Sequence, residues 1–180
     1  MKRKTFVVPL LVLCCISMIQ AQNAAPKPDP EIEKLHVFVG HWRGEGETKP
    51  LPQHPTAQKL VFEETNEMIL GGFFLEVRDS GMMGLQLYII GYDPAKKTYP
   101  VAWYTDAGTT AFGTMTCEGN TWILTWSSES GGKPYQGKFT MNVAPDGMSH
   151  TDKQEASSDG TTWITVYEGK LTKVSSEAKK

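Results

Sequence analysis

The sequence predicts an all-β protein, a single antiparallel up-and-down β-barrel of about ten strands with a short N-terminal cap helix. Three observations support this prediction. A chain of 180 residues has the length of one domain. Most of it consists of short, alternating apolar and polar segments separated by turn sequences, as in sandwiches and barrels. Closure into a barrel is favoured over an open sheet because it leaves no exposed strand edge.

The N-terminal residues 1–21 are expected to be a secretory signal peptide. Residues 2–4 are basic, residues 6–19 are apolar, and Ala21 ends a segment suited to cleavage. Two alternatives stay open: an uncleaved membrane anchor and a lipoprotein attached at Cys14 or Cys15. The apolar run is shorter than the roughly 20 residues that a membrane-spanning helix needs. We therefore expect a periplasmic or extracellular protein that has no membrane attachment after cleavage.

Removal of this leader makes the chain more acidic. The three basic residues 2–4 leave with it, so the net charge of −2 becomes near −5. An acidic chain without a basic stripe is poorly suited to nucleic acid or to anionic lipid surfaces. Cys117 is then the remaining cysteine, so no intrachain disulfide is expected.

A linker is predicted at residues 22–31, and the helix is predicted to begin at its C-terminal end. Asp29 has the character of an N-cap, Pro30 suits the first helical position, and Gly40 ends the segment. This helix is expected to close one end of a barrel domain that spans residues 32–174. Residues 175–180 are expected to be a frayed tail.

The strands are predicted from apolar/polar alternation and from the turns between them. Three prolines in residues 49–55 exclude a central strand there, and residues 128–133 are predicted to form a Gly/Ser loop. The glycines at the end of residues 68–72 predict a tight turn or bulge. The predicted strands are residues 41–48, 57–67, 73–79, 85–92, 98–106, 109–118, 121–127, 135–143, 148–156 and 161–174.

Three motifs in order resemble a known family. They are Phe38–Gly46 (Phe-Val-Gly-His-Trp-Arg-Gly-Glu-Gly), Met68–Leu75 (Met-Ile-Leu-Gly-Gly-Phe-Phe-Leu) and Gly91–Lys97 (Gly-Tyr-Asp-Pro-Ala-Lys-Lys), followed by Trp103. They are similar to motifs of the secreted bacterial domain-of-unknown-function family 1579 (DUF1579), over residues 32–174. The resemblance implies a calycin-like barrel, related in architecture to the lipocalins, and it implies no activity.

A more distant likeness is to nitrobindin-type haem barrels, which also open with a Gly-x-Trp strand after a helix. Those proteins hold haem iron with a histidine on a late strand. The corresponding strand here, residues 163–174, contains no histidine, and Glu168 falls near the ligand position. We therefore expect neither haem nor another cofactor.

The first strand carries candidate site residues. Trp42 is expected to pack the base of the barrel beneath the helix. Glu45 and Glu47 share one face, where they are either solvated or, in one case, turned inward as an acid–base group. His41 and His36 could share the barrel mouth. The four histidines form no metal-binding motif.

Three tryptophans and one aspartate are the candidates for a ligand cavity. Trp103, Trp122 and Trp126 lie on predicted barrel strands, where they either line a pocket or fill the core. Asp106, near the end of the Trp103 strand, either orients a ligand or caps a turn.

Binding of a small, largely apolar molecule inside the barrel is the function that the sequence favours. Two alternatives stay open: an enzyme that uses a cavity carboxylate or histidine, and a structural or interaction module with a filled barrel. Binding is preferred over catalysis, although fold does not fix function. The strand at residues 85–92 is apolar on both faces, which predicts cover by the cap helix or by a second subunit, and hence a homodimer.

Overall fold

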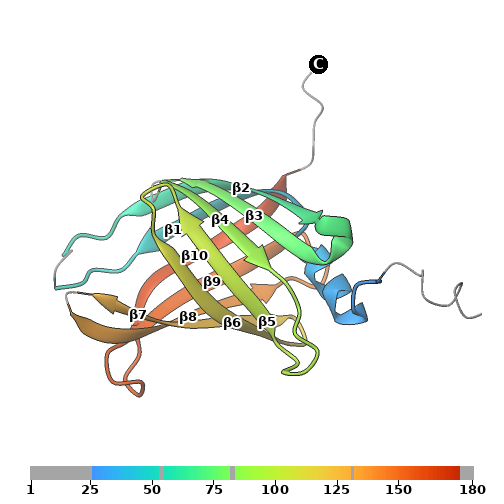
Figure 1. The fold of residues 1–180 in the computed structure, drawn as a ribbon. Coiled ribbons are helices and arrows are strands. Elements are labelled where there is room, and N and C mark those ends of the chain that lie inside the picture. Colours follow the sequence, from blue (N-terminus) through green and yellow to red (C-terminus); the bar gives the residue numbers. More distant parts are fainter. Residues whose placement is uncertain (1–25, 53–54, 82–83, 131, 175–180) are drawn as a thin grey trace, which may run out of the picture.

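A computed structural model describes residues 26–52, 55–81, 84–130 and 132–174. Ten strands form one closed antiparallel barrel (Figure 1). This confirms the predicted up-and-down barrel. The strands are β1 (Gly40–Thr48), β2 (Lys59–Ile69), β3 (Phe74–Gly81), β4 (Gly84–Ile90), β5 (Tyr99–Thr105), β6 (Thr110–Glu118), β7 (Thr121–Ser130), β8 (Lys133–Val143), β9 (Ser149–Ser157) and β10 (Ile164–Val174).

Each strand pairs with its neighbours along the chain, and β1 pairs with β10 to close the barrel. In that closing pair His41 lies opposite Val174, and Thr48 lies opposite Tyr167. Closure satisfies the backbone hydrogen-bonding groups of both outer strands, which an open sheet would leave as edges.

The N-terminal helix η1 (Pro30–Phe38) is a 3-10 helix. Its apolar residues Ile32, Leu35 and Phe38 recur every three positions, and all three are buried. A 3-10 helix has three residues per turn, so this spacing places the three side chains in one row. Asp29 caps the helix as predicted, because its Oδ1 accepts a hydrogen bond from the Glu31 backbone N–H at 2.9 Å.

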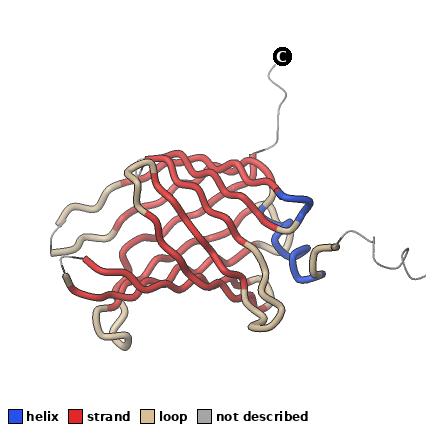
Figure 2. The backbone as a smooth tube through the Cα atoms, in the orientation of Figure 1, coloured by secondary structure: helices blue, strands red, loops and turns tan. Residues whose placement is uncertain are grey.

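The apolar core lies where η1 meets the barrel. It is formed by Ile32, Leu35, Phe38, Leu75, Ile90, Tyr99, Val101, Met115, Trp122 and Val143. Trp42 is buried as predicted, and its Nε1 donates to the Phe38 carbonyl at 2.7 Å. Figure 2 shows η1 and the short helix η2 (Leu70–Gly72) at the same end of the barrel.

Two connections refine the predicted strand boundaries. The Gly/Ser loop predicted for residues 128–133 is wrong, because β7 and β8 stay paired until Ser130 lies opposite Lys133. Backbone pairing continues through this hairpin, although serines and a glutamate with low strand propensity form its β7 side. The turn predicted at residues 68–72 is present, and Leu70, Gly71 and Gly72 there have positive φ angles.

Several expectations concern residues outside these ranges. The proposed leader, the start of the linker, and residues 175–180 all lie outside the described residues. Among the described residues, neither helical segment is long and apolar enough to cross a bilayer as a helix.

Candidate functional site

A cavity of about 320 Å³ lies inside the barrel. Residues of η1 and of strands β2 to β10 line it. The wall is largely apolar, with aromatic and aliphatic side chains such as Phe62, Trp103, Leu124, Trp126 and Phe139. Its polar residues are Glu64, Asn66, Asp79, Gln86, Tyr88, His150, Asp152, Gln154 and Tyr167.

Glycines on the inner face keep this space open. Gly44 lies opposite Phe62, and a methyl group at Gly44 would collide with the Phe62 ring. Gly137 lies opposite Trp126 in the same way. The aromatic rings therefore lie against the bare backbone of the neighbouring strand, and the centre of the barrel is left unfilled.

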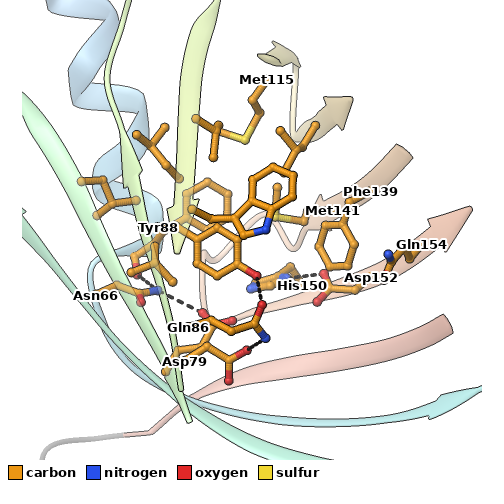
Figure 3. Close-up of a pocket in the computed structure, with 18 of the residues that line it drawn as sticks. Asn66, Asp79, Gln86, Tyr88, Met115, Phe139, Met141, His150, Asp152 and Gln154 are labelled. Atoms are coloured by element: carbon orange, nitrogen blue, oxygen red, sulfur yellow. Dashed lines mark hydrogen bonds and ion pairs between the residues drawn. The ribbon is translucent and has the colours of Figure 1, made fainter. Parts of the chain in front are cut away.

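One polar group in the cavity is a chain of three side chains from β3 and β4. The Tyr88 hydroxyl donates to Gln86 Oε1 at 2.9 Å, and Gln86 Nε2 donates to Asp79 Oδ2 at 3.3 Å (Figure 3). The second carboxylate oxygen, Asp79 Oδ1, is buried and has no hydrogen-bond partner among the described residues. It therefore offers an unpaired acceptor to whatever enters the cavity.

Two further polar groups line the cavity, a pair on β9 and a pair on β2 that bonds the end of η1. His150 Nδ1 lies 2.6 Å from Asp152 Oδ1, and both side chains are buried (Figure 3). On β2, Asn66 Nδ2 donates to Glu64 Oε2 and to the Phe38 carbonyl, each at 3.1 Å. Because both of these partners are acceptors, the amide nitrogen of Asn66 must face them.

The burial of these carboxyl groups changes their acidity. Removal from water raises the pKa of Glu64 to about 7, an effect that the Asn66 hydrogen bond partly offsets. Burial also raises the pKa of Asp79 to about 6. The pKa of Asp152 is raised by burial as well, against the opposing effect of His150. Glu64 and Asp79, with pKa values this close to neutral pH, can exchange protons with a bound molecule.

No metal-binding cluster occurs among the residues that the structure describes, where a cluster means three or more His, Cys, Asp or Glu side chains. Glu168, at the position of the haem ligand in the likeness noted above, is exposed on the outside of β10. Its carboxylate lies 2.7 Å from Lys49 Nζ.

The three predicted tryptophans take two different positions. Trp103 and Trp126 line the cavity, with their ring centroids 5.6 Å apart in an edge-to-face arrangement. Trp122 is not among the lining residues. It is buried in the core, where its ring contacts Phe38 and Tyr99.

The predicted polar residues lie outside the cavity. His41 is exposed, with Nδ1 3.1 Å from Thr65 Oγ1, and Glu45 is exposed beside Arg43. Asp106 is also exposed, and its Oδ2 accepts a hydrogen bond from the Leu85 backbone N–H at 3.0 Å. Asp106 therefore bonds the backbone at the start of β4, whereas the turn that follows it is held by Thr105, whose Oγ1 accepts from the Thr109 backbone N–H at 3.2 Å.

The interior carboxylates are the residues that sequence reasoning missed. Glu64 follows Leu60 and Phe62 at two-residue spacing, and Asp79 follows Leu75 and Val77 in the same way. Strand alternation therefore places both inside the barrel. That signal is present in the sequence, but a charged residue at the end of an apolar row also fits a strand that is leaving the core.

Comparisons with known proteins give a family and a fold. The family model described as "Protein of unknown function (DUF1579)" matches residues 27–173. Among solved structures, the chain is similar to Rv2717c from M. tuberculosis, with 12% identity and a TM-score of 0.57. That match covers 82% of this chain and 99% of the other, and at this identity it shows the fold alone. No curated protein matches the chain.

Proposed function

The chain belongs to the DUF1579 family of proteins of unknown function, and we propose that it binds a small, largely apolar molecule inside its barrel. The cavity of about 320 Å³ carries this proposal. Its size lies at the lower end of the range that ligand pockets occupy. A barrel that served only as a structural module would gain stability by filling this space with side chains.

The composition of the wall supports the same function. Ligand pockets combine mostly apolar walls with a few polar groups that orient the guest. Here Phe62, Trp103, Trp126 and Phe139 supply apolar surface, and polar atoms such as Asp79 Oδ1 find no partner in the described ranges. A guest that pairs with these atoms would remove the free-energy cost of burying them alone.

Native mass spectrometry of the full chain, purified from its own cells, tests the proposal. We expect a retained small-molecule adduct. Val77→Phe places a ring in the cavity and should abolish the adduct. Val61→Phe, on the exposed outer face of β2, should retain it and serves as the matched control. An adduct that persists in Val77→Phe, or an adduct-free native protein, would contradict binding in the barrel.

We propose also that binding takes place outside the cytoplasm. The support is the leader predicted at residues 1–21. The intact mass of the protein recovered from the cell envelope and from the medium tests this. A chain beginning at Gln22 is expected, whereas a full-length cytoplasmic chain would reject export.

Acid–base catalysis in the same cavity is a second candidate. Its specific support is that burial raises the pKa of Glu64 to about 7, in a cavity that also contains the His150–Asp152 pair. A desolvated carboxylate is a stronger base than one in water. This candidate uses neither His41 nor Glu45, because both lie on the outer surface.

The ring opening of 5-nitrobenzisoxazole tests this candidate. A base removes the C3 proton, the N–O bond breaks, and a coloured cyanophenolate forms. We expect the rate to rise with pH through about 7 and to be lost in Glu64→Gln but kept in Glu63→Gln. A rate equal to that of buffer, or unchanged in Glu64→Gln, would reject a base in the cavity.

A further inference from the structure

The ionisable side chains that line the cavity include three carboxyl groups, those of Glu64, Asp79 and Asp152. No lysine or arginine occurs among the lining residues in the described part of the chain. Of the described lining residues, only His150 can carry a positive charge, and it is already paired with Asp152 at 2.6 Å. The charge of the interior therefore favours a cation over an anion.

Three buried polar atoms in the cavity wall could accept a hydrogen bond from a guest. Asp79 Oδ1, Asn66 Oδ1 and the Tyr167 hydroxyl are buried without a hydrogen-bond partner among the described residues. Asn66 and Tyr167 are only 4% and 7% exposed, and both line the cavity. Each of the three atoms can accept a hydrogen bond, so a guest that donates several would satisfy them.

Among the three carboxyl groups, Asp79 has the weakest hydrogen bonding within the protein, which makes it the best partner for a charged donor. Glu64 is held by Asn66, and Asp152 is held by His150. Within the described part of the chain, Asp79 has only the 3.3 Å contact to Gln86, which Tyr88 in turn orients (Figure 3). Asp79 thus lines the cavity with one carboxylate oxygen that no described residue holds.

Aromatic rings surround the same space. The Tyr88 and Trp103 ring centroids are 6.2 Å apart, and Trp126 packs edge-to-face on Trp103. The faces of such rings attract cations, and their area accommodates an apolar body.

From this arrangement we propose that the guest is a small protonated amine with an apolar or aromatic body, whose ammonium group binds Asp79. This inference rests on the proposed binding function and gives it a ligand class. The ammonium donates to Asp79 Oδ1, and the body lies against the tryptophans and Phe62.

Binding of such a guest is coupled to proton release. Burial raises the pKa of Asp79 to about 6, so the carboxyl group of the empty barrel is protonated in mildly acidic solution. The ammonium favours the carboxylate and therefore displaces that proton. The other titratable groups that line the cavity are Glu64 on β2, Tyr88 on β4, His150 and Asp152 on β9, and Tyr167 on β10. If Asp79 alone must ionise, affinity at pH 5 is about tenfold lower than at pH 7.

Three matched probes test the ligand class: phenethylamine, 2-phenylethanol and 3-phenylpropanoate. Their affinities for the full chain can be measured at pH 7 by calorimetry and by tryptophan fluorescence, since Trp103 and Trp126 line the cavity. We expect the amine to bind at least tenfold more tightly than the alcohol, and the carboxylate to bind most weakly. Asp79→Asn should remove the preference for the amine, while Glu63→Gln on the outer face should keep it.

The pH dependence of the native protein provides a test that needs no variant. Phenethylamine affinity should rise about tenfold from pH 5 to pH 7, with proton release detected in buffers of different ionisation enthalpy. Equal or tighter binding of the alcohol or the carboxylate would overturn the amine inference and leave barrel binding intact. Failure of all three probes would also overturn it, and a barrel that is empty in native mass spectrometry as well would overturn the proposed function itself.

Discussion

At the scale of single residues, the cavity depends on glycines that face aromatic side chains across neighbouring strands. Trp126 lies directly opposite Gly137, and Phe62 lies directly opposite Gly44. In each pair the ring occupies the space where a Cβ atom would stand. The missing side chains are thus as important for the cavity as the residues that line it.

Gly137→Ala should push the Trp126 indole from the wall toward the centre of the barrel. We expect the free energy of unfolding to fall by about 1–3 kcal/mol, because the added methyl group overpacks the contact. Urea denaturation measures this change. The control is the same Gly137→Ala change in a Trp126→Leu background. Because the indole is absent there, the added methyl group should cause only a small loss of stability. Equal losses in both backgrounds would contradict the collision.

Glu64 should make the protein less stable as the pH rises toward neutrality. Burial raises its pKa from 4.5 to about 7, so the native state holds the proton more tightly than the unfolded chain. The free energy of unfolding therefore declines between about pH 4.5 and pH 7 and is level above that range. At about 1.4 kcal/mol per pKa unit, the upper limit of this decline is about 3 kcal/mol. Asp79 and Asp152 reinforce the raised pKa, whereas Asn66 and His150 oppose it.

Glu64→Gln should flatten this decline and make the protein more stable than the wild type at pH 8. In this variant the free energy of unfolding should still decline somewhat at lower pH, because burial also raises the pKa of Asp79. Urea denaturation at several pH values measures the difference. Glu63→Gln, whose side chain is exposed on the outer face of β2, should leave the profile unchanged. Parallel profiles for the wild type and Glu64→Gln would show that Glu64 is not desolvated.

At the scale of elements, the sequence predicts the strands and the helix start but leaves open whether the barrel is hollow or filled. Alternation finds the strands, Asp29-Pro30 finds the start of η1, and the three-residue spacing of its apolar side chains fits a 3-10 helix. The open space depends on register, because it requires Gly44 to meet Phe62 on another strand. Local patterns do not encode which residues meet across strands, so the sequence predicts Trp103 and Trp126 as lining residues without predicting the open space. Glu64 and Asp79 are missed for a different reason, because a charged residue at the end of an apolar row also fits a strand that leaves the core.

The helix η1 should contribute strongly to stability through its buried row. Leu35 is fully buried between the helix and the barrel core. Leu35→Ala should reduce the free energy of unfolding by about 2–5 kcal/mol, the range for deletion of a buried leucine side chain. His36→Ala, at the next and exposed position, is the matched control for helix propensity. A similar small loss in both variants, measured by thermal and urea unfolding, would show that η1 is only loosely attached.

At the scale of the whole molecule, the outside of the barrel carries an apolar patch on β4, β5 and β6. Leu85, Tyr104 and Phe112 are 61%, 41% and 67% exposed. Phe112 lies opposite Ala102, and Tyr104 lies opposite Leu87, so the patch is continuous across three neighbouring strands. The cap helix predicted as one possible cover does not shield it, as the exposure of Leu85 shows.

A second copy of the chain is the partner we expect on this patch. The outward residues at its centre are uncharged, so two copies can meet there without like-charge repulsion, and a twofold dimer joins identical surfaces. Static light scattering should show a mass that rises from monomer to dimer with concentration. Phe112→Ser should hold the protein as a monomer, whereas Val61→Ser, which removes an exposed side chain from β2, should not. A monomer mass for the wild type at every concentration would reject the dimer and leave the patch as ordinary exposed surface.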